Sequence, residues 1–457
     1  MKITHVIHGF PPYNNAGAEI YTYKIAREQA RTEEVAVFHR ISDPKLEEYA
    51  VTHEHLDGLD IWRVNNTLRQ CRSYEEIYTN PGVAEVFREF LDTARPDVVH
   101  IGHLTMLSTL IVEELAKRGI PRVMTLHDFW LVCLRGQLLD QSFKICADPG
   151  KAWCEECHPE QAAVADSSMV AKAFRRLSDG LHLGDDRRRA LFGTLYKFLA
   201  RRRGDTGEID ISAQIQLRRE HMKSACEKID LFISPSNFLR EQCVKFGIVR
   251  PERIIHSDNG QDTAPFRDFR RTPSDKIRFG FVGAIIPSKG LHVLLEAFKG
   301  IDPDSAELNV HGGFVEYHEL RDYPARIKSL AARPGVNMRG AYQPEDVATA
   351  YADIDVLVAP SIWYENSPLV IHEAFMAGAP VIASNAGGMA ELVKHEENGL
   401  LFELGNAKSL REAMQRFIDD RNLAEKLRRE IPKVKTIEEN TKELLGIYRR
   451  LQKNREG

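Results

Sequence analysis

The chain has 457 residues, which exceeds the size of one ordinary hydrophobic core and predicts two domains of about 200 residues each. With 43% hydrophobic and 28% charged residues, its composition is that of a globular protein and excludes a disordered one. A net charge of −4 argues against a dedicated nucleic-acid binder, and no apolar run approaches the roughly 20 residues of a transmembrane helix. The first residues resemble a β-strand and not a signal peptide, so we expect a cytoplasmic protein.

Short β-branched runs alternate with helical stretches in the first half of the chain, and the alternation restarts in the second half. This pattern predicts two parallel, doubly wound sheets. The expected strands are residues 2–8, 35–39, 61–64, 98–101, 123–126 and 231–234, then 276–283, 307–311, 336–339, 355–359, 381–383 and 400–402. A turn-rich segment at 258–262 marks the join, so we expect Rossmann-like domains over 1–262 and 263–432, followed by a helix over 433–457.

The loop after the first expected strand is rich in proline and leads through Ala16, Gly17 and Glu19 into a helix. A glycine at a helix start lets backbone N–H groups approach an anion, and the helix dipole favours negative charge there. Gly17 is therefore a predicted anion contact. The alternative is an ordinary strand-to-helix turn, which also tolerates glycine.

Two strands expected in the first half end in histidines. His103 follows the strand at 98–101, and His127 with Asp128 follows the strand at 123–126. Ligands of open α/β sheets bind at the carboxyl ends of the strands, which places these side chains where a ligand is expected. A core histidine satisfied by the backbone is the alternative for His103, and for His100 it is the preferred interpretation.

Four cysteines fall between residues 133 and 157, in a loop that we call the Cys-rich loop (133–158). They are Cys133, Cys146, Cys154 and Cys157. A Cys-x-x-Cys pair with two further thiols matches a tetrahedral structural zinc site, in which His158 could replace one thiol. Unliganded thiols and an iron–sulfur cluster are the alternatives.

The sequence of residues 167–220 predicts a helical, basic insertion in which arginines are interleaved with aromatic and leucine side chains. A basic amphipathic element of this kind favours attachment to an anionic membrane surface or to an anionic lipid-linked acceptor. The alternative is a solvent-exposed helical insertion that covers part of the first domain and binds no membrane.

Two glutamates lie on either side of an expected strand-to-helix turn in the second half. Residues 354–360 predict a buried parallel strand, and Pro368 suits the first turn of a helix, so 361–367 form the loop between them. Glu365 lies on this loop, and Glu373 lies about one and a half turns into the helix, so both can contact one elongated ligand. Lys289 follows Gly283 at the start of another helix, where it can neutralise a phosphate.

These motifs, with Glu365 and Glu373 separated by seven residues, resemble the retaining glycosyltransferases of family 4 over nearly the whole chain. The resemblance implies the GT-B fold, in which two Rossmann-like, doubly wound α/β domains face each other across a cleft and the C-terminal helix packs back on the first domain. Ala16 and Ala284 depart from the family pattern, which has glycine and arginine there. The catalytic residues that it implies are His127, Glu365 and Lys289. The donor-binding residues that it implies are Gly17, Gly283, Lys289, Glu365, Asn366, Ser367, Pro368, Leu369 and Glu373, and those on the acceptor side are His103 and Asp128.

The expected reaction moves a hexose from a UDP- or GDP-sugar to the hydroxyl of a glycan or lipid-linked acceptor. In the implied mechanism, Glu373 holds the ribose, Glu365 the sugar, and the leaving diphosphate takes the acceptor proton, so catalysis needs no cofactor. Bacterial polysaccharide assembly at the inner face of the plasma membrane is the implied setting. A sugar-nucleotide epimerase with the GT-B fold and a silent nucleotide-sugar-binding subunit are the alternatives, and a glycoside hydrolase would have no use for Lys289.

Overall fold

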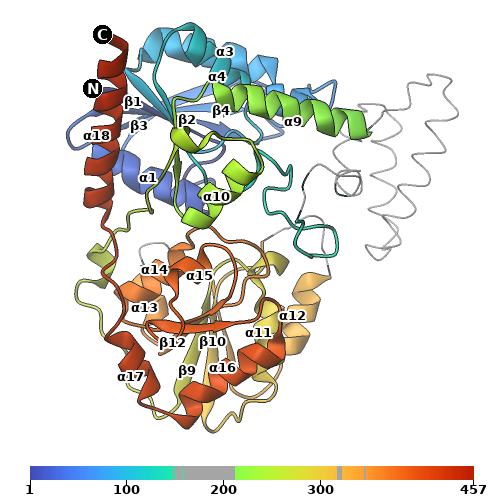
Figure 1. The fold of residues 1–457 in the computed structure, drawn as a ribbon, viewed down its shortest axis with the longest axis vertical. Helices are drawn as coiled ribbons and strands as arrows, with labels where there is room; N and C mark the ends of the chain where they lie inside the picture. The colour runs from blue at the N-terminus through green and yellow to red at the C-terminus, as the bar shows by residue number, and fades with distance from the viewer. Residues whose placement is uncertain (148, 150–156, 158–210, 316–321, 344–345, 457) are drawn as a thin grey trace, which may run out of the picture.

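The computed structural model describes residues 1–147, 149, 157, 211–315, 322–343 and 346–456, which form two lobes stacked one above the other (Figure 1). The first lobe contains an eight-stranded sheet in the order β3-β4-β2-β1-β5-β6-β7-β8, and the second a six-stranded sheet in the order β11-β10-β9-β12-β13-β14. Neighbouring strands run parallel in both sheets, apart from the antiparallel pair β3 and β4. Each sheet is therefore doubly wound, as the alternation of strands and helices predicts.

The strands of the first sheet are β1 (Lys2–Ile7), β2 (Glu34–Ile41), β3 (Val51–Leu56), β4 (Leu59–Asn65), β5 (Val98–Ile101), β6 (Arg122–Thr125), β7 (Leu231–Ser234) and β8 (Ile254–His256). The helices that pack around it are α1 (Gly17–Gln29), α2 (Glu76–Thr79), α3 (Pro81–Ala94), α4 (Leu110–Lys117), α9 (Ile211–Glu227), α10 (Asn237–Lys245) and α18 (Ile437–Glu456). Strands β1, β5 and β6 are almost entirely buried, because helices cover both faces of the sheet.

The strands of the second sheet are β9 (Ile277–Val282), β10 (Ala306–His311), β11 (Val336–Gly340), β12 (Val356–Ala359), β13 (Val381–Ser384) and β14 (Gly399–Phe402). Its helices are α11 (Leu291–Phe298), α12 (Tyr323–Ala331), α13 (Val347–Tyr351), α14 (Leu369–Met376), α15 (Met389–Leu392), α16 (Ala407–Asp419) and α17 (Leu423–Arg428). The 3-10 turn at Pro287–Lys289 joins β9 to α11 and carries one of the predicted site residues.

Two strands, β3 and β8, are not predicted from the sequence. Strand β3 is the exposed edge strand of the first sheet, and its polar residues lack the apolar alternation that identifies a half-buried strand. A tight turn at Asp57 and Gly58, both with positive φ, connects it to β4. Strand β8 has only three residues and lies at the opposite edge.

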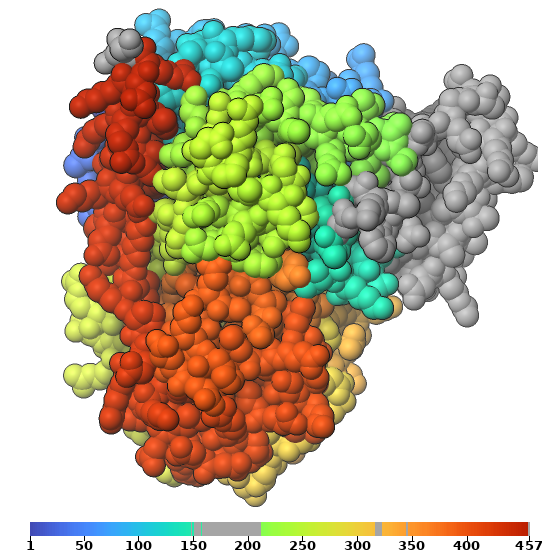
Figure 2. Space-filling view, in the orientation of Figure 1, coloured from blue at the N-terminus to red at the C-terminus, as the bar shows by residue number. Residues whose placement is uncertain are grey.

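The C-terminal helix α18 lies along α1 of the first lobe although it follows the second lobe in the sequence (Figure 1). The Tyr21 hydroxyl donates to Asn440 Oδ1 (2.8 Å), and the Tyr448 hydroxyl contacts the buried ring of His100. His100 also binds the Thr125 hydroxyl, so it is a core residue. The C-terminal segment runs along one side of both lobes (Figure 2) and ties them together.

The two lobes meet through the carboxyl ends of their sheets. Trp363 and Tyr364, in the loop after β12, leave the second domain and pack against the hydrophobic core of the first. The ring of Tyr364 lies 4.8 Å from that of Phe238 in α10. The loop between β12 and α14 is therefore held between the domains.

Candidate functional site

The Glu365 carboxylate is the centre of the second domain's polar network. Its Oε1 atom accepts hydrogen bonds from Lys289 Nζ (2.7 Å), Ser361 Oγ (2.8 Å) and Trp363 Nε1 (2.8 Å). Glu365 is only 5% exposed, so its carboxylate has lost most of its hydrating water. The three donors replace the hydrogen bonds to that water. The network fixes the orientation of the carboxylate before any ligand arrives.

Glycines bring Lys289 against the loop that carries Glu365. Gly290 begins α11 with a φ of 74°, and a Cβ there would lie 1.8 Å from the carbonyl oxygen of Pro360. Only glycine allows this approach, which places the preceding Lys289 beside Glu365. At the end of β9, Gly283 has a φ of 138°, and a Cβ there would meet no atom within 4 Å, so the space on this side of the backbone is open.

Glu373 lies in the second turn of α14 and faces the first domain. Its Oε2 atom accepts a hydrogen bond from the Tyr351 hydroxyl (3.0 Å). Burial raises the pKa of Glu373, and the charge of Lys24 in α1 and the hydrogen bond from Tyr351 oppose this effect. The influence of Lys24 shows that the carboxyl lies close to the interface between the domains.

Two helix N-termini from different domains also meet at this interface. Helix α1 begins at Gly17 and helix α14 at Leu369, and neither has a side-chain hydrogen bond to cap its first N–H groups. A Cβ at Gly17 would contact the Leu369 side chain at 3.8 Å, so the two ends are adjacent. Uncapped N–H groups at two adjacent helix N-termini favour an anion such as a diphosphate.

The residues between Glu365 and α14 contact the first domain. The Asn366 side-chain amide donates to the His127 carbonyl oxygen (2.7 Å), and the Ser367 hydroxyl donates to Asp258 Oδ1 (2.6 Å) and contacts His372 Nε2 (2.8 Å). In this structure, the side chains of these two predicted donor residues therefore hold the domains together. Pro368 is the N-cap residue of α14.

The histidines predicted at the strand ends lie together in the first domain. His103 Nδ1 accepts from the Thr105 N–H (3.0 Å), which leaves the proton on Nε2, and this atom donates to Asp128 Oδ1 (3.1 Å). Burial by itself would raise the pKa of Asp128, but the interaction with His103 and the hydrogen bond from the Trp130 N–H lower it. Burial lowers the pKa of His127 to about 4, so its ring is neutral at pH 7.

Two further polar residues belong to this site although neither is predicted as a site residue from the sequence. His8 follows β1 as His103 follows β5, and its ring centroid lies 4.7 Å from that of His103. His8 Nε2 binds Oε1 of Glu19, in the first turn of α1, at 3.1 Å. The recurrence of histidine after a third parallel strand is the signal that could have identified His8.

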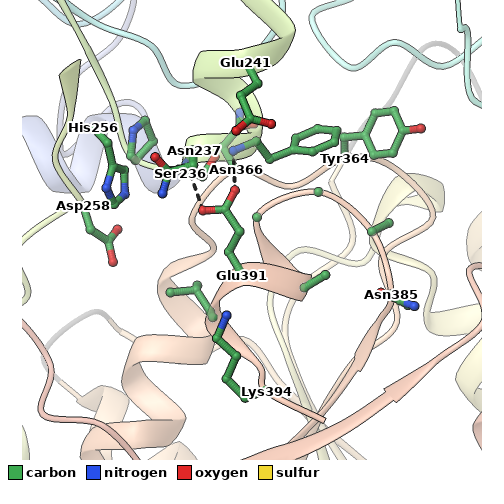
Figure 3. Close-up of a pocket in the computed structure, with 17 residues that line it drawn as sticks. Ser236, Asn237, Glu241, His256, Asp258, Tyr364, Asn366, Asn385, Glu391 and Lys394 are labelled. Atoms are coloured by element: carbon green, nitrogen blue, oxygen red, sulfur yellow. Dashed lines mark hydrogen bonds between the residues drawn. The ribbon is translucent and has the colours of Figure 1, made fainter. Parts of the chain in front are cut away.

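A separate cavity of about 720 Å³ lies between the domains on the side of β13 and α15 (Figure 3). Its described lining includes Asn366 but neither Glu365 nor Glu373. Within it, the Glu391 carboxylate accepts from the N–H groups of Asn237 (2.9 Å) and Phe238, at the start of α10. This contact caps a helix of the first domain from the second.

The zinc prediction and the membrane prediction fall largely outside the described residues. Cys133, Cys146 and Cys157 are partly exposed, whereas Cys154 and residues 167–210 of the insertion are not described. Across the described ranges, no three His, Cys, Asp or Glu side chains are placed to hold a metal ion. None of the described helices combines the length and apolar character that crossing a membrane requires. The four-thiol zinc site and the basic membrane contact stay predictions.

Comparisons with known proteins give a consistent result. The model "Glycosyl transferases group 1" matches residues 262–434, and the model "Glycosyltransferase Family 4" matches residues 15–177. A GDP-mannose-dependent alpha-mannosyltransferase of Mycobacterium tuberculosis is 32% identical over 181 residues, 38% of this chain and 44% of that protein. The UDP-Gal:alpha-D-GlcNAc-diphosphoundecaprenol alpha-1,3-galactosyltransferase of Escherichia coli is 30% identical over 205 residues, 40% of this chain and 50% of that protein. The chain thus matches at most half the length of these relatives.

Among solved structures, sucrose-phosphate synthase from Thermosynechococcus elongatus superimposes with a TM-score of 0.64, at 18% identity and over 98% of both chains. A likeness at this identity concerns the fold. It confirms the predicted two-domain GT-B architecture, with a parallel sheet in each domain.

Proposed function

We propose that this chain, which belongs to the family 4-like glycosyltransferases with the GT-B fold, transfers a sugar from a nucleotide diphosphate sugar to an acceptor hydroxyl with retention of configuration. The observation that carries the proposal is the arrangement at the carboxyl edge of the second sheet. The buried Glu365 carboxylate there, paired with Lys289 from the turn after β9, lies on the same loop-and-helix unit as a second glutamate and an uncapped helix N-terminus.

The donor would bind in an extended conformation along this edge. Glu373 accepts hydrogen bonds from the ribose hydroxyls, because a carboxylate pairs well with two adjacent hydroxyl donors. The diphosphate lies between the N-termini of α1 and α14, with Lys289 as its cationic partner. Glu365, which Lys289 holds in place, contacts the sugar. The two relatives described above are named for GDP-mannose and UDP-galactose, which supports a donor of this class.

In the reaction, the bond between the anomeric carbon and the diphosphate oxygen breaks, and the acceptor oxygen forms a new bond on the same face of the sugar. The leaving diphosphate accepts the acceptor proton. Lys289 and the two helix dipoles stabilise its negative charge, so we propose that catalysis proceeds without a metal ion. The Glu365 carboxylate and the neutral His127 ring position the sugar as positive charge develops on it.

Isothermal titration of two variants tests the donor assignment. Removing one charged hydrogen-bonding partner costs about 1.5–3 kcal/mol. Glu373→Ala should therefore weaken both the sugar nucleotide and the free nucleoside diphosphate by roughly tenfold to a hundredfold, whereas Glu365→Ala should weaken only the sugar nucleotide. UDP, GDP, UDP-galactose and GDP-mannose are the ligands, and the exposed Glu412→Ala is the control. Equal losses for both ligand types in Glu365→Ala would refute the division of roles.

A silent nucleotide-sugar-binding subunit is the second candidate, because Ala284 stands where the family pattern has a cationic arginine. Such a protein would bind the donor without turnover, and an epimerase would convert it without an acceptor. Release of nucleoside diphosphate that depends on an added acceptor distinguishes a transferase from both.

We further propose that the enzyme works on glycan or lipid-linked acceptors at the inner face of the plasma membrane, in polysaccharide assembly. The basic composition of residues 167–220 supports this setting, as does the lipid diphosphate acceptor named for the Escherichia coli relative. Co-sedimentation with anionic but not neutral vesicles, weakening as salt rises, is the expected result. Absence of binding to anionic vesicles at low salt would favour a soluble acceptor.

A further inference from the structure

Five polar side chains of the first domain form a cluster at the interface between the domains. This acceptor-side cluster consists of His8, Glu19, His103, His127 and Asp128. Its members come from the carboxyl ends of β1, β5 and β6 and from the first turn of α1, so four separate segments build one site. The charges that act on His127 are those of the other four members, which shows that the five groups lie close together.

Three atoms of the cluster are buried and have no hydrogen-bond partner within the described part of the chain. They are His8 Nδ1, Glu19 Oε2 and His127 Nε2. Folded proteins satisfy most buried polar atoms, since each unsatisfied one costs about 1–3 kcal/mol. Three such atoms on neighbouring side chains therefore indicate hydrogen-bonding positions that a ligand fills. The site is not sealed, because the side chains of His8 and Asp128 are 26% and 29% exposed.

A purely structural role accounts for only part of this arrangement. A carboxylate in the first turn of α1 stabilises the helix dipole, and Glu19 Oε1 forms an ion pair with His8. That role leaves the second oxygen of Glu19 unused, although the residue is only 3% exposed. It also gives no reason for the unpaired Nε2 of His127. A hydroxylated ligand explains both atoms at once.

We propose that the acceptor-side cluster binds adjacent hydroxyl groups of a neutral sugar at the reactive end of the acceptor, with Glu19 as the residue that selects it. This inference rests on the proposed transferase function and names the acceptor class for the same active site. The free oxygen of the Glu19 carboxylate accepts a hydrogen bond from one hydroxyl. The unpaired Nδ1 of His8 is placed for a neighbouring hydroxyl of the acceptor, whereas Nε2 of His127 is left for the donor sugar.

The ionised carboxylates of the cluster restrict the kind of acceptor that it can bind. Burial by itself would raise the pKa of Glu19, but the hydrogen bond and charge of His8 lower it, so the carboxylate is ionised at neutral pH. Asp128, whose pKa is also lowered, adds a second negative charge. A phosphate offers the free oxygen of Glu19 no hydroxyl donor, so the phosphate of a lipid-linked acceptor would lie away from this oxygen. A simple aliphatic alcohol would leave the unpaired atoms unsatisfied.

Glycoside binding to the full chain tests the proposal directly. The probes are octyl glucoside, octyl galactoside and octyl N-acetylglucosaminide, with 1-octanol and glucose 6-phosphate as counter-probes. Saturation-transfer NMR in the presence of UDP or GDP measures binding without relying on turnover, and release of nucleoside diphosphate from UDP-galactose or GDP-mannose measures transfer. We expect at least one neutral glycoside to bind and to stimulate release, and neither counter-probe to do so.

Glu19→Gln should raise the KM of the active glycoside about tenfold to a hundredfold, while the Kd of the sugar nucleotide should not rise, because the variant only removes a negative charge near the proposed diphosphate position. Deoxy analogues of that glycoside make the test more specific. The analogue that lacks the hydroxyl bound by Glu19 should have the same KM in Glu19→Gln as in the wild type. Glu28→Gln is the matched control, since Glu28 lies in the same helix and pairs with Arg31. It should leave both KM and the melting temperature unchanged.

Three results would overturn the proposal. One is a Glu19→Gln variant that loses melting temperature but keeps the wild-type glycoside KM, which would assign Glu19 to helix stability alone. A second is equal stimulation by 1-octanol or glucose 6-phosphate. The third is that no glycoside binds or stimulates nucleoside diphosphate release, although Glu373→Ala still weakens donor binding; the donor assignment would then stand without this inference. If Glu373→Ala left donor binding unchanged, the proposed function would be refuted, and this inference with it.

Discussion

The carboxyl edges of the two sheets differ in how their polar groups are satisfied. In the second domain, Glu365 Oε1 receives three hydrogen bonds and Glu373 receives one from Tyr351. In the first domain, His8, Glu19 and His127 each retain a buried atom without a partner in the described structure. The two donor-side carboxylates are thus held by contacts within the chain, whereas Glu19 keeps an unpaired carboxylate oxygen; on the donor side, the unpartnered atoms among the described residues are those of the uncharged Ser288 and Asn366 side chains.

The domains also differ in their buried imidazoles. Burial lowers the pKa of His5, His39 and His127 in the first domain to about 4, and in the second domain it does so for His292. Of these rings only His127 belongs to the candidate site, because His5 pairs with Gln29 and His39 with the Arg40 carbonyl in the core. A neutral imidazole suits uncharged hydroxyls, whereas Lys289 in the second domain suits phosphate.

Removing the cation of the donor edge should have the largest effect. Lys289→Ala should lower kcat by about a hundredfold to a thousandfold, because the leaving diphosphate loses its side-chain cation and Glu365 loses a hydrogen-bond donor. Steady-state kinetics with the preferred donor measure this change. Lys394→Ala, at the other interdomain cavity, is the control and should retain kcat. A loss below tenfold for Lys289→Ala would mean that the helix N-termini alone stabilise the leaving group.

Acid should destabilise the first domain before the second. The three first-domain histidines have folded-state pKa values near 4, below the ordinary 6.5, so the unfolded chain binds protons more readily. Their stabilising contribution is complete above about pH 6.5 and is lost as the pH falls toward 4, at up to about 3 kcal/mol for each group. Hydrogen-exchange mass spectrometry from pH 7.5 to 4.5 should show α1 and α3 losing protection before α16. If α16 lost protection before α1 and α3, the expected difference in acid stability between the domains would be refuted.

The contact between Glu391 and the start of α10 joins the two domains but belongs to neither site, so its loss should have a smaller effect than the loss of Lys289. Glu391→Ala removes the carboxylate that caps α10 from the second domain, at a cost of about 0.5–2 kcal/mol in the free energy of unfolding. Urea unfolding measures this loss, and Glu397→Ala, an exposed residue, is the control. Because the capping group belongs to neither site, the affinity of UDP or GDP should change less than in Glu373→Ala. A larger loss of affinity would show that domain contact, and not donor contact, controls binding.

The smallest effect on stability is expected at the start of α1. A Cβ at Gly17 would meet only the Leu369 side chain, at an ordinary contact distance of 3.8 Å. Because alanine favours helix over glycine by up to about 1 kcal/mol, Gly17→Ala should unfold no earlier than the wild type. If the diphosphate approaches the backbone here, UDP or GDP affinity should still fall several-fold. Unchanged affinity in calorimetry would place the diphosphate on α14 alone.

Much of the architecture follows from local sequence patterns. The apolar runs identify twelve of the described strands, and the position of Glu365 before Pro368 identifies the loop at the end of β12. Strand-end reasoning also places His103, His127 and Asp128 correctly at one edge of the sheet. These inferences succeed because side-chain periodicity and turn residues are properties of short segments. Strand β3 is missed because an exposed edge strand needs no apolar face.

By itself, the sequence determined two doubly wound domains and the side chains at the ends of their strands. Only the tertiary structure decided that Lys289 pairs with Glu365, that His8 and Glu19 join His103, and that the Asn366 amide contacts the first domain. The family resemblance already placed the C-terminal helix on the first domain, and the structure shows the contacts by which α18 completes that core, such as the one between Tyr21 and Asn440. These pairs are distant in the sequence or belong to different elements. Their meeting depends on strand order and on how the domains pack, which local periodicity does not encode.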